Sequence, residues 1–175
     1  MTLRPAAFLD RDGVLNDDLG YVVRRDDFHW LPGVMPALQR LQQAGYALVV
    51  VTNQSGVARG LYTLADVDAL HAHMQQELQA NGVTLTAVYA CPHHPDGVVS
   101  TYRQDCDCRK PRPGMILQAL RAHGLDPARS LLVGDKASDI EAGRAADVSR
   151  CIQVGAGQAA RDLAEAVDQF LGTPA

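Results

Sequence analysis

The 175-residue sequence predicts an α/β fold built on an open parallel sheet. Short apolar runs alternate with amphipathic segments along the chain, and this alternation favours parallel strands joined by helices. Several apolar runs end in polar residues, as expected when strands finish at a shared ligand-binding edge. The length suits one domain, so we expect residues 1–175 to form a single domain.

The alternation gives five strands and five helices. The expected strands lie at 6–10, 46–52, 86–90, 130–134 and 150–154. The expected helices lie at 34–44, 63–80, 113–123, 137–146 and 157–171.

The first helix is supported by spacing and by its end. Val34, Leu38 and Leu41 recur at helical spacing, and Gly45 follows as a stop signal. The segment before it, 13–33, is too long for a tight strand-to-helix loop. A hairpin flap over the strand ends and an irregular loop both fit that segment.

The later helices carry capping residues. Thr63 is a suitable N-cap for the second helix, with acidic Asp66 in its first turn. Gly82 ends that helix, and Gly124 ends the helix that opens at Pro113. The remaining elements follow from the same alternation.

Composition excludes several classes of function. The chain is 47% hydrophobic and 21% charged, and its net charge is −4 without a basic block. Nonspecific nucleic-acid binding needs a cationic surface, so we expect no nucleic-acid partner. No apolar run approaches the ~18 residues of a membrane span, and the N-terminal residues lack the apolar core of a signal peptide. We therefore expect a cytoplasmic protein without a membrane partner. We also expect a monomer, although composition does not bear on the oligomeric state.

Four polar segments lie at the predicted strand ends or beside them. They are Asp10-Arg11-Asp12-Gly13, Thr52-Asn53-Gln54-Ser55, Arg109-Lys110-Pro111, and Gly134-Asp135-Lys136 with Asp139 beyond. Each segment alone is typical of an ordinary turn or solvated loop. Together they supply carboxylates, a hydroxyl and a lysine, which are the groups that metal-assisted phosphoryl transfer requires.

The residue types suggest a division of roles. One carboxylate can form an aspartyl-phosphate, while a second protonates the leaving alkoxide and then activates water. Asp10, Asp135 and a backbone carbonyl suit Mg²⁺, which prefers hard oxygen ligands. Thr52 with the following amides can bind an anion, and Lys110 can neutralise developing charge.

A second metal site is predicted between 91 and 108. Cys91-Pro92-His93 and Cys106-Asp107-Cys108 provide a Cys₃His set, a common structural zinc composition. His94 could replace His93, and a disulfide or free thiols are the alternatives. Zinc in this loop would fix the position of the two cations that follow it, Arg109 and Lys110. Cys151 lies in a predicted strand and reads as a buried small apolar residue.

The four polar segments together resemble the motifs of haloacid-dehalogenase superfamily phosphatases. The D-x-D-G motif of that family is matched by residues 10–13, and its later motifs by Thr52, Lys110 and Gly134-Asp135 with Asp139. The resemblance implies a Rossmann-like, doubly wound parallel sheet. It also implies Asp10 as the nucleophile, Asp12 as the general acid and base, and Mg²⁺ held by Asp10, the Asp12 main-chain oxygen and Asp135.

Within the superfamily, the chain is similar to the branch that acts on heptose bisphosphates. The matching stretches are 8–13, 20–22, 52–60, 91–95, 106–111 and 134–136. The resemblance implies removal of the 7-phosphate of D-glycero-D-manno-heptose 1,7-bisphosphate, a step towards ADP-heptose and the lipopolysaccharide core. It implies structural Zn²⁺ on Cys91, His93, Cys106 and Cys108. It also implies substrate contacts from Arg11, Asp18, Gly20, Tyr21, Asn53, Gln54, Ser55, Arg109 and Lys136. Leu19 departs from the polar residue that related sequences often carry.

Two rival functions remain. The histidinol-phosphate phosphatase branch shares the aspartate motif, the zinc loop and Arg-Lys-Pro, but matches less well at 53–60 and at Lys136. A zinc-binding interaction module without activity is opposed by the intact set of catalytic residue types. A polynucleotide phosphatase fits less well for want of a basic strand-binding groove.

The spacing of the motifs also predicts open access to the site. Neither the interval from Asp12 to Thr52 nor that from Thr52 to Lys110 leaves room for a cap domain of ~50 residues. Arg109, beside Lys110 in an extended segment, can reach a more distant part of the ligand, such as a second phosphate. The alternative is that Arg109 braces the zinc loop by pairing with Asp107.

Overall fold

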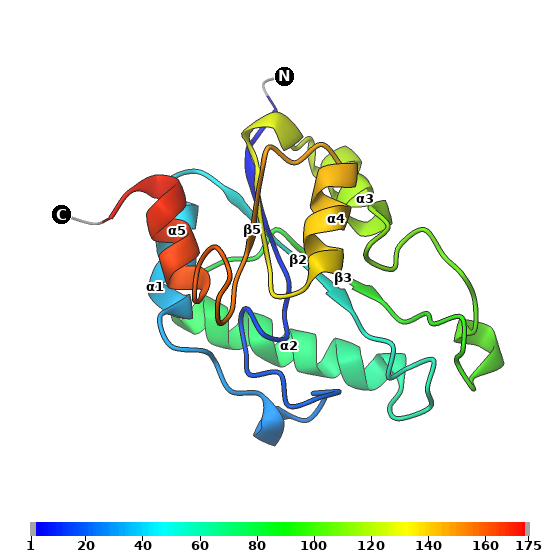
Figure 1. Ribbon diagram of the computed structural model, residues 1–175. Coiled ribbons are helices and arrows are strands. Elements are labelled where there is room, and N and C mark those ends of the chain that lie inside the picture. The colour runs from blue at the N-terminus through cyan, green and yellow to red at the C-terminus, as the bar shows by residue number, and fades with distance from the viewer. Residues whose placement is uncertain (1–2, 174–175) are drawn as a thin grey trace.

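The computed structural model describes residues 3–173 and contains one five-stranded parallel sheet (Figure 1). The strand order is β3-β2-β1-β4-β5, so the first strand lies in the middle of the sheet. The strands are β1 (Ala6–Leu9), β2 (Ala47–Asn53), β3 (Ala87–Cys91), β4 (Leu131–Gly134) and β5 (Arg150–Gln153). Every residue of β1 and β4 is buried, which explains why these strands are continuous apolar runs rather than alternating ones. The predicted parallel sheet is confirmed.

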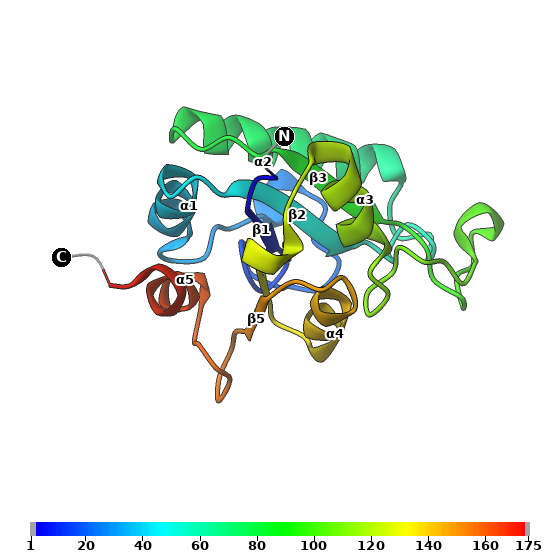
Figure 2. The same ribbon diagram turned by 90° about the horizontal axis from the view of Figure 1, so that it is seen from above.

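Five α-helices cover the two faces of the sheet. They are α1 (Val34–Gln43), α2 (Leu64–Ala80), α3 (Gly114–His123), α4 (Ala137–Ala145) and α5 (Leu163–Leu171). The apolar side chains of α1, α2 and α5 pack on one face, and those of α3 and α4 pack on the other. Figures 1 and 2 show α1 beside α5 on one side of the molecule, and α3 beside α4 on the other. The sheet is therefore wound on both sides, as predicted.

The expected helix caps are present. Thr63 and Asp66 form a reciprocal capping box at the start of α2, and Gly124 ends α3 in the left-handed conformation with φ 60°. Three short 3-10 helices lie in the connections, at Arg25–Asp27, Ser100–Tyr102 and Pro127–Arg129.

The last helix is shorter than the sequence predicts. The expected range was 157–171, but α5 begins at Leu163 with Asp162 as its N-cap. The segment before it forms a turn, because Gly155 N–H donates to the Ala160 carbonyl and Val154 bridges to Ala160. The amphipathic pattern extends through this turn, so periodicity alone placed the start too early.

The segment 13–33 is an irregular loop that is pinned at its base. Asn16 forms an antiparallel bridge with Trp30, and Leu31 N–H donates to the Leu15 carbonyl. Between these contacts the chain contains no strand, so an extended hairpin flap is not formed. The loop runs past the carboxyl ends of the strands, in the lower part of Figure 1. Helix α2 is seen in the same part of that view.

In residues 3–173 we find no helix that combines the length and apolar character needed to cross a bilayer.

Candidate active site

The carboxyl ends of three neighbouring strands meet at one cavity. Asp10 follows β1, Thr52 lies near the end of β2, and Asp135 follows β4. Because β1 lies between β2 and β4, these three positions are adjacent at the same edge. The cavity beside them has a volume of about 510 Å³. Its lining residues are Asp10, Asp12, Asp18, Gly20, Tyr21, Thr52, Asn53, Gln54, Ser55, Tyr62, Arg109, Lys110, Pro111, Lys136, Ser138 and Asp139.

A buried lysine holds two carboxylates at the base of the cavity. Lys110 Nζ lies 2.8 Å from Asp10 Oδ1 and 2.7 Å from Asp139 Oδ1. It also donates to the Val51 carbonyl at 2.7 Å. Burial alone would lower the pKa of Lys110, but Asp10 and Asp139 outweigh burial and raise it. The ammonium group is therefore charged, and it fixes the Asp10 carboxylate in one orientation.

Three carboxylates gather around this lysine. Oxygens of Asp10, Asp135 and Asp139 all lie within 4.8 Å of one another. Burial raises the pKa of Asp10 to about 7, with Asp139 and Asp135 adding to the shift and Lys110 opposing it. Three carboxylates and one ammonium leave a local charge of about −2 when all are ionised, which suits a divalent cation.

The surroundings of Asp135 support the same conclusion. Its Oδ1 is buried and has no hydrogen-bond partner among the described residues, as expected for an oxygen reserved for a metal. A Cβ added to Gly13 would lie 2.5 Å from Asp135 Oδ2, so only glycine allows this close approach. The donor set is all oxygen and anionic, and it fits Mg²⁺ rather than a thiolate-seeking metal.

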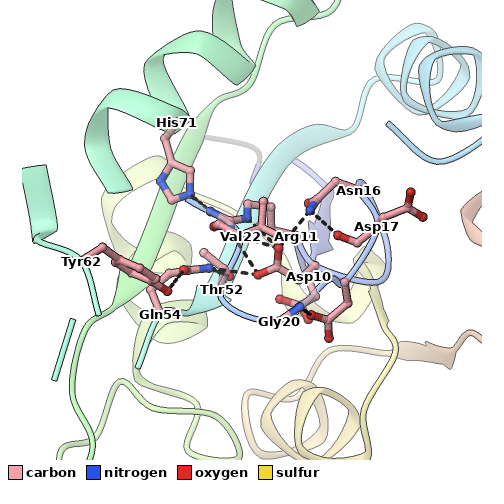
Figure 3. A network of polar contacts seen from close by, with 12 residues as sticks. Asp10, Arg11, Asn16, Asp17, Gly20, Val22, Thr52, Gln54, Tyr62 and His71 are labelled. Carbon is pink, nitrogen blue, oxygen red and sulfur yellow. Dashed lines mark hydrogen bonds and ion pairs between the residues drawn. The ribbon is translucent and has the colours of Figure 1, made fainter. Parts of the chain in front are cut away.

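Asp12 is held by three neighbouring side chains, those of Arg11, Asn16 and Gln54, which are labelled in Figure 3. Arg11 Nη2 donates to Oδ1 at 2.9 Å, and Asn16 Nδ2 donates to the same oxygen at 3.0 Å. Gln54 Nε2 donates to Oδ2 at 3.2 Å. The Asp12 side chain keeps 17% of its surface exposed, so it still faces the cavity. A carboxylate fixed in this way is preorganised for proton transfer.

Thr52 and Tyr62 belong to the same network through Gln54. Thr52 Oγ1 accepts from Gln54 Nε2 at 2.8 Å, so its own hydroxyl hydrogen remains free for a phosphoryl oxygen. Tyr62 donates to Gln54 Oε1 at 2.9 Å. Burial raises the pKa of Tyr62 to about 12, which keeps the phenol protonated as a donor. Gly56 is required here, because an added Cβ would lie 2.2 Å from the Tyr62 ring.

Several residues expected to contact substrate reach the cavity from its loops. Asp18, Gly20, Tyr21 and Ser55 line it, and Lys136 approaches Asp18, with Nζ 3.3 Å from Oδ2. The polar groups of two other expected residues are already occupied. Gln54 is engaged with the network above. The Asn53 amide donates to the Lys110 carbonyl and accepts from the Lys110 N–H, both at 3.1 Å.

Arg109 is placed between two hollows. It lines the main cavity and also a neighbouring hollow beside His94 and Cys106. Its Nη1 is buried and has no hydrogen-bond partner among the described residues. Asp107 is 99% exposed and lies 3.8 Å from Arg112, so it is not the counterion of Arg109. The bracing pair that the sequence allowed is therefore not formed.

The structure gives Arg11 a different place from the one expected. Its side chain is fully buried and does not line the cavity, so a substrate contact by this side chain is not supported. The reason is that its guanidinium points inward, where it contacts the Asp12 carboxylate, the Val22 carbonyl and His71 of α2. Conversely, sequence reasoning overlooked Tyr62 and Ser138 and gave Asp139 no separate role, although all three line the cavity.

The cysteine cluster lies beside this site. The Sγ atoms of Cys91, Cys106 and Cys108 are 3.0 to 3.5 Å apart, and all are free thiols. His93 Nδ1 lies 3.4 Å from Cys108 Sγ, whereas His94 is turned toward Arg59. Tetrahedral zinc with ~2.3 Å bonds to sulfur needs similar donor separations. The four groups could therefore hold a metal, and the histidine among them is His93.

Comparison with known proteins identifies the family. The HAD-hydrolase-like family model matches residues 107–172. D-glycero-beta-D-manno-heptose-1,7-bisphosphate 7-phosphatase of Escherichia coli (strain K12) is 49% identical over 154 residues, which are 88% of this chain and 81% of that protein. The enzyme of the same name from Rhodopseudomonas palustris is 48% identical over 145 residues, 83% of this chain and 81% of that protein. The chain belongs to this family of phosphatases.

A solved structure within the family supports the assignment. D,D-heptose 1,7-bisphosphate phosphatase from B. bronchiseptica, complexed with magnesium and phosphate, has a TM-score of 0.80 and 34% identity. The match covers 95% of this chain and 98% of that one. The predicted haloacid-dehalogenase fold and phosphatase activity are thus confirmed.

Proposed function

We propose that this phosphatase removes the 7-phosphate of D-glycero-D-manno-heptose 1,7-bisphosphate, using Mg²⁺. The observation that carries the substrate assignment is Arg109, which lines the same cavity as Asp10 and whose Nη1 has no hydrogen-bond partner among the described residues. A guanidinium without a counterion is a ready partner for a second phosphate. The names of the relatives, which specify a heptose bisphosphate, support the same substrate.

The reaction proceeds in two displacements. An Asp10 oxygen attacks phosphorus, the bond from phosphorus to the sugar oxygen breaks, and an aspartyl-phosphate forms. Asp12 gives its proton to the departing sugar oxygen. Asp12 then takes a proton from the water that attacks the aspartyl-phosphate, which releases phosphate and restores Asp10. Thr52 and Lys110 stabilise the charge on the transferring group.

Two metals support these steps. We assign Mg²⁺ to Asp10, the Asp12 main-chain oxygen and Asp135, where it supplies positive charge that neutralises the phosphoryl oxygens. Asp139 is the third carboxylate of the cluster with Asp10 and Asp135, and it forms an ion pair with Lys110. We assign structural Zn²⁺ to Cys91, His93, Cys106 and Cys108. With all four positions filled, that metal orders the loop that carries the two cations following it.

The rest of the substrate is assigned to the loops. Asp18, Gly20, Tyr21, Ser55 and Lys136 line the outer cavity and are proposed to contact the sugar. We further propose that the chain acts as one domain without a cap and as a monomer. A cytoplasmic location stays a prediction from the sequence.

A substrate panel tests this proposal. The purified protein with Mg²⁺ is given heptose 1,7-bisphosphate and, separately, histidinol phosphate, and phosphate release is measured. Phosphorus NMR of the first reaction should show heptose 1-phosphate as the product. We expect kcat/KM to favour the bisphosphate by at least about 100-fold, the discrimination typical of one well-placed polar contact. Preference for histidinol phosphate, or removal of the 1-phosphate, would contradict the assignment.

A further inference from the structure

Arg11 is a buried cation that the proposed reaction does not use. It is fully buried and does not line the cavity, although it stands between the two catalytic aspartates in sequence. Burying an ion pair is a poor way to stabilise a fold, because desolvation offsets the attraction between the charges. A fully buried arginine at this position therefore calls for another explanation.

The contacts of Arg11 join two parts of the site. Its Nε and Nη2 approach Asp12 Oδ1 at 3.2 and 2.9 Å, so one edge of the guanidinium faces the carboxylate. Nη2 also donates to the Val22 carbonyl at 2.6 Å. Val22 follows Gly20 and Tyr21, which line the cavity from the loop 13–33. One planar group thus fixes both the acid–base carboxylate and the substrate-facing loop (Figure 3).

The opposite side of the guanidinium is held by His71 of α2. Arg11 Nη1 lies 3.0 Å from His71 Nε2, and both side chains are buried. An arginine can only donate, so Nε2 must be the acceptor and the ring proton must sit on Nδ1. His71 itself is not among the residues that line the cavity.

The placement of His71 on its helix also indicates that its role is to hold Arg11. It occupies a core position of α2, between the buried apolar residues Leu70 and Met74. A histidine there costs desolvation that an apolar residue would avoid. Among the described residues, the polar partner of its side chain is Arg11. A guanidinium stays protonated throughout, so this support does not change while Asp12 gives and takes a proton.

We propose that Arg11 and His71 are positioning residues for the general acid and base. His71 orients the Arg11 guanidinium, and Arg11 in turn holds Asp12 at the angle required for protonating the leaving oxygen. The inference rests on the proposed two-step mechanism but not on the identity of the sugar.

The test compares leaving groups in His71 variants. The substrates are p-nitrophenyl phosphate, which departs without a proton, and the alkyl phosphate that the wild-type enzyme hydrolyses best. His71→Leu removes the acceptor, and His71→Gln keeps an acceptor at the position of Nε2. His73→Leu is the matched control, because His73 lies on the same helix and pairs with Glu77 instead.

We expect His71→Leu to lower kcat/KM about tenfold for the alkyl phosphate and less than about twofold for the aryl phosphate, from loss of one hydrogen bond to a charged group. A pre-steady-state burst of p-nitrophenol should appear in this variant, because the water-activating step also slows. His71→Gln and His73→Leu should both stay within about twofold of wild type on both substrates.

Three results would overturn the inference. They are equal losses on the two substrates, no loss on either, or a His71→Gln variant as impaired as His71→Leu. If His71→Leu does not fold, Arg11→Lys keeps the buried charge without the planar fork and is read by the same criteria. A wild-type enzyme that hydrolyses no phosphomonoester would instead refute the proposed function itself.

Discussion

Replacing Arg109 with alanine is the sharpest test of how the cavity selects its substrate. The side chain lines the cavity, and its buried Nη1 has no partner among the described residues. Truncation should therefore leave no protein group newly unpaired, so the loss reports a missing contact to substrate. Lys110 remains with Asp10 and Asp139 and continues to serve the transferring phosphoryl group.

The size of the effect follows from the kind of contact that is lost. A hydrogen bond to a charged group contributes about 1.5 to 3 kcal/mol, which corresponds to roughly a 10- to 150-fold loss in kcat/KM. This loss is expected for heptose 1,7-bisphosphate, which has a second phosphate. A simple monophosphate should lose less than about threefold. Arg109→Lys should fall between these values on the bisphosphate, because a lysine reproduces the charge without the bidentate geometry.

The assay measures kcat/KM by phosphate release for both substrates with wild type, Arg109→Ala and a control. Arg103→Ala is the control, since Arg103 is an exposed cation in the loop 91–108 and lines neither the main cavity nor the neighbouring hollow. It should behave like wild type on both substrates. Equal losses by Arg109→Ala on the two substrates would refute the role in binding a second phosphate.

Three further outcomes are expected. Asp12→Asn should lower kcat/KM at least about 100-fold for alkyl phosphates but under about tenfold for p-nitrophenyl phosphate, and equal losses would speak against Asp12 as the acid. Cys106→Ser should release zinc by metal analysis and lower Tm by roughly 2–4 °C for each kcal/mol of stability lost, whereas Cys151→Ser should retain the metal; a zinc-free wild type would contradict the assignment. Burial and then Arg11 lower the pKa of His71 to about 3, so below pH 6.5 the unfolded chain takes up a proton that the native protein does not. The free energy of unfolding should therefore fall by about 1.4 kcal/mol per pH unit below 6.5 through this group, and urea titrations of His71→Gln should lack that component; identical slopes would refute it.

Much of the fold could be predicted because the three central strands are buried on both faces. Each of β1, β2 and β4 is a continuous apolar run that ends in a polar segment. Such runs are easily distinguished from the amphipathic helical segments that lie between them in the sequence. The start of α5 could not be predicted, because the turn at Gly155 is fixed by a contact with Ala160 rather than by composition. Long-range contacts of this kind leave no periodic signal.

The residues of the candidate site could also be predicted only in part. Asp10, Thr52 and Asp135 could be placed because strand ends in a parallel sheet meet at one edge. Tyr62 could not, since the contact with Gln54 that holds it beside the cavity leaves no signal in the sequence.

His71, in contrast, had a sequence signal. It falls at helical spacing among Val67, Leu70, Met74 and Leu78, all buried in α2. A polar residue within such an apolar stripe marks a buried polar contact, although the sequence does not reveal the partner.

The most direct test of the central claim is to trap the covalent intermediate on Asp10. The Asp12→Asn variant is mixed with p-nitrophenyl phosphate and Mg²⁺, quenched in acid during the burst, and reduced with borohydride, which converts an aspartyl-phosphate to homoserine. Peptide mass spectrometry should find homoserine at position 10 in an amount close to that of the burst. Homoserine at Asp135 or Asp139 instead, or a burst with no modified aspartate, would contradict Asp10 as the nucleophile.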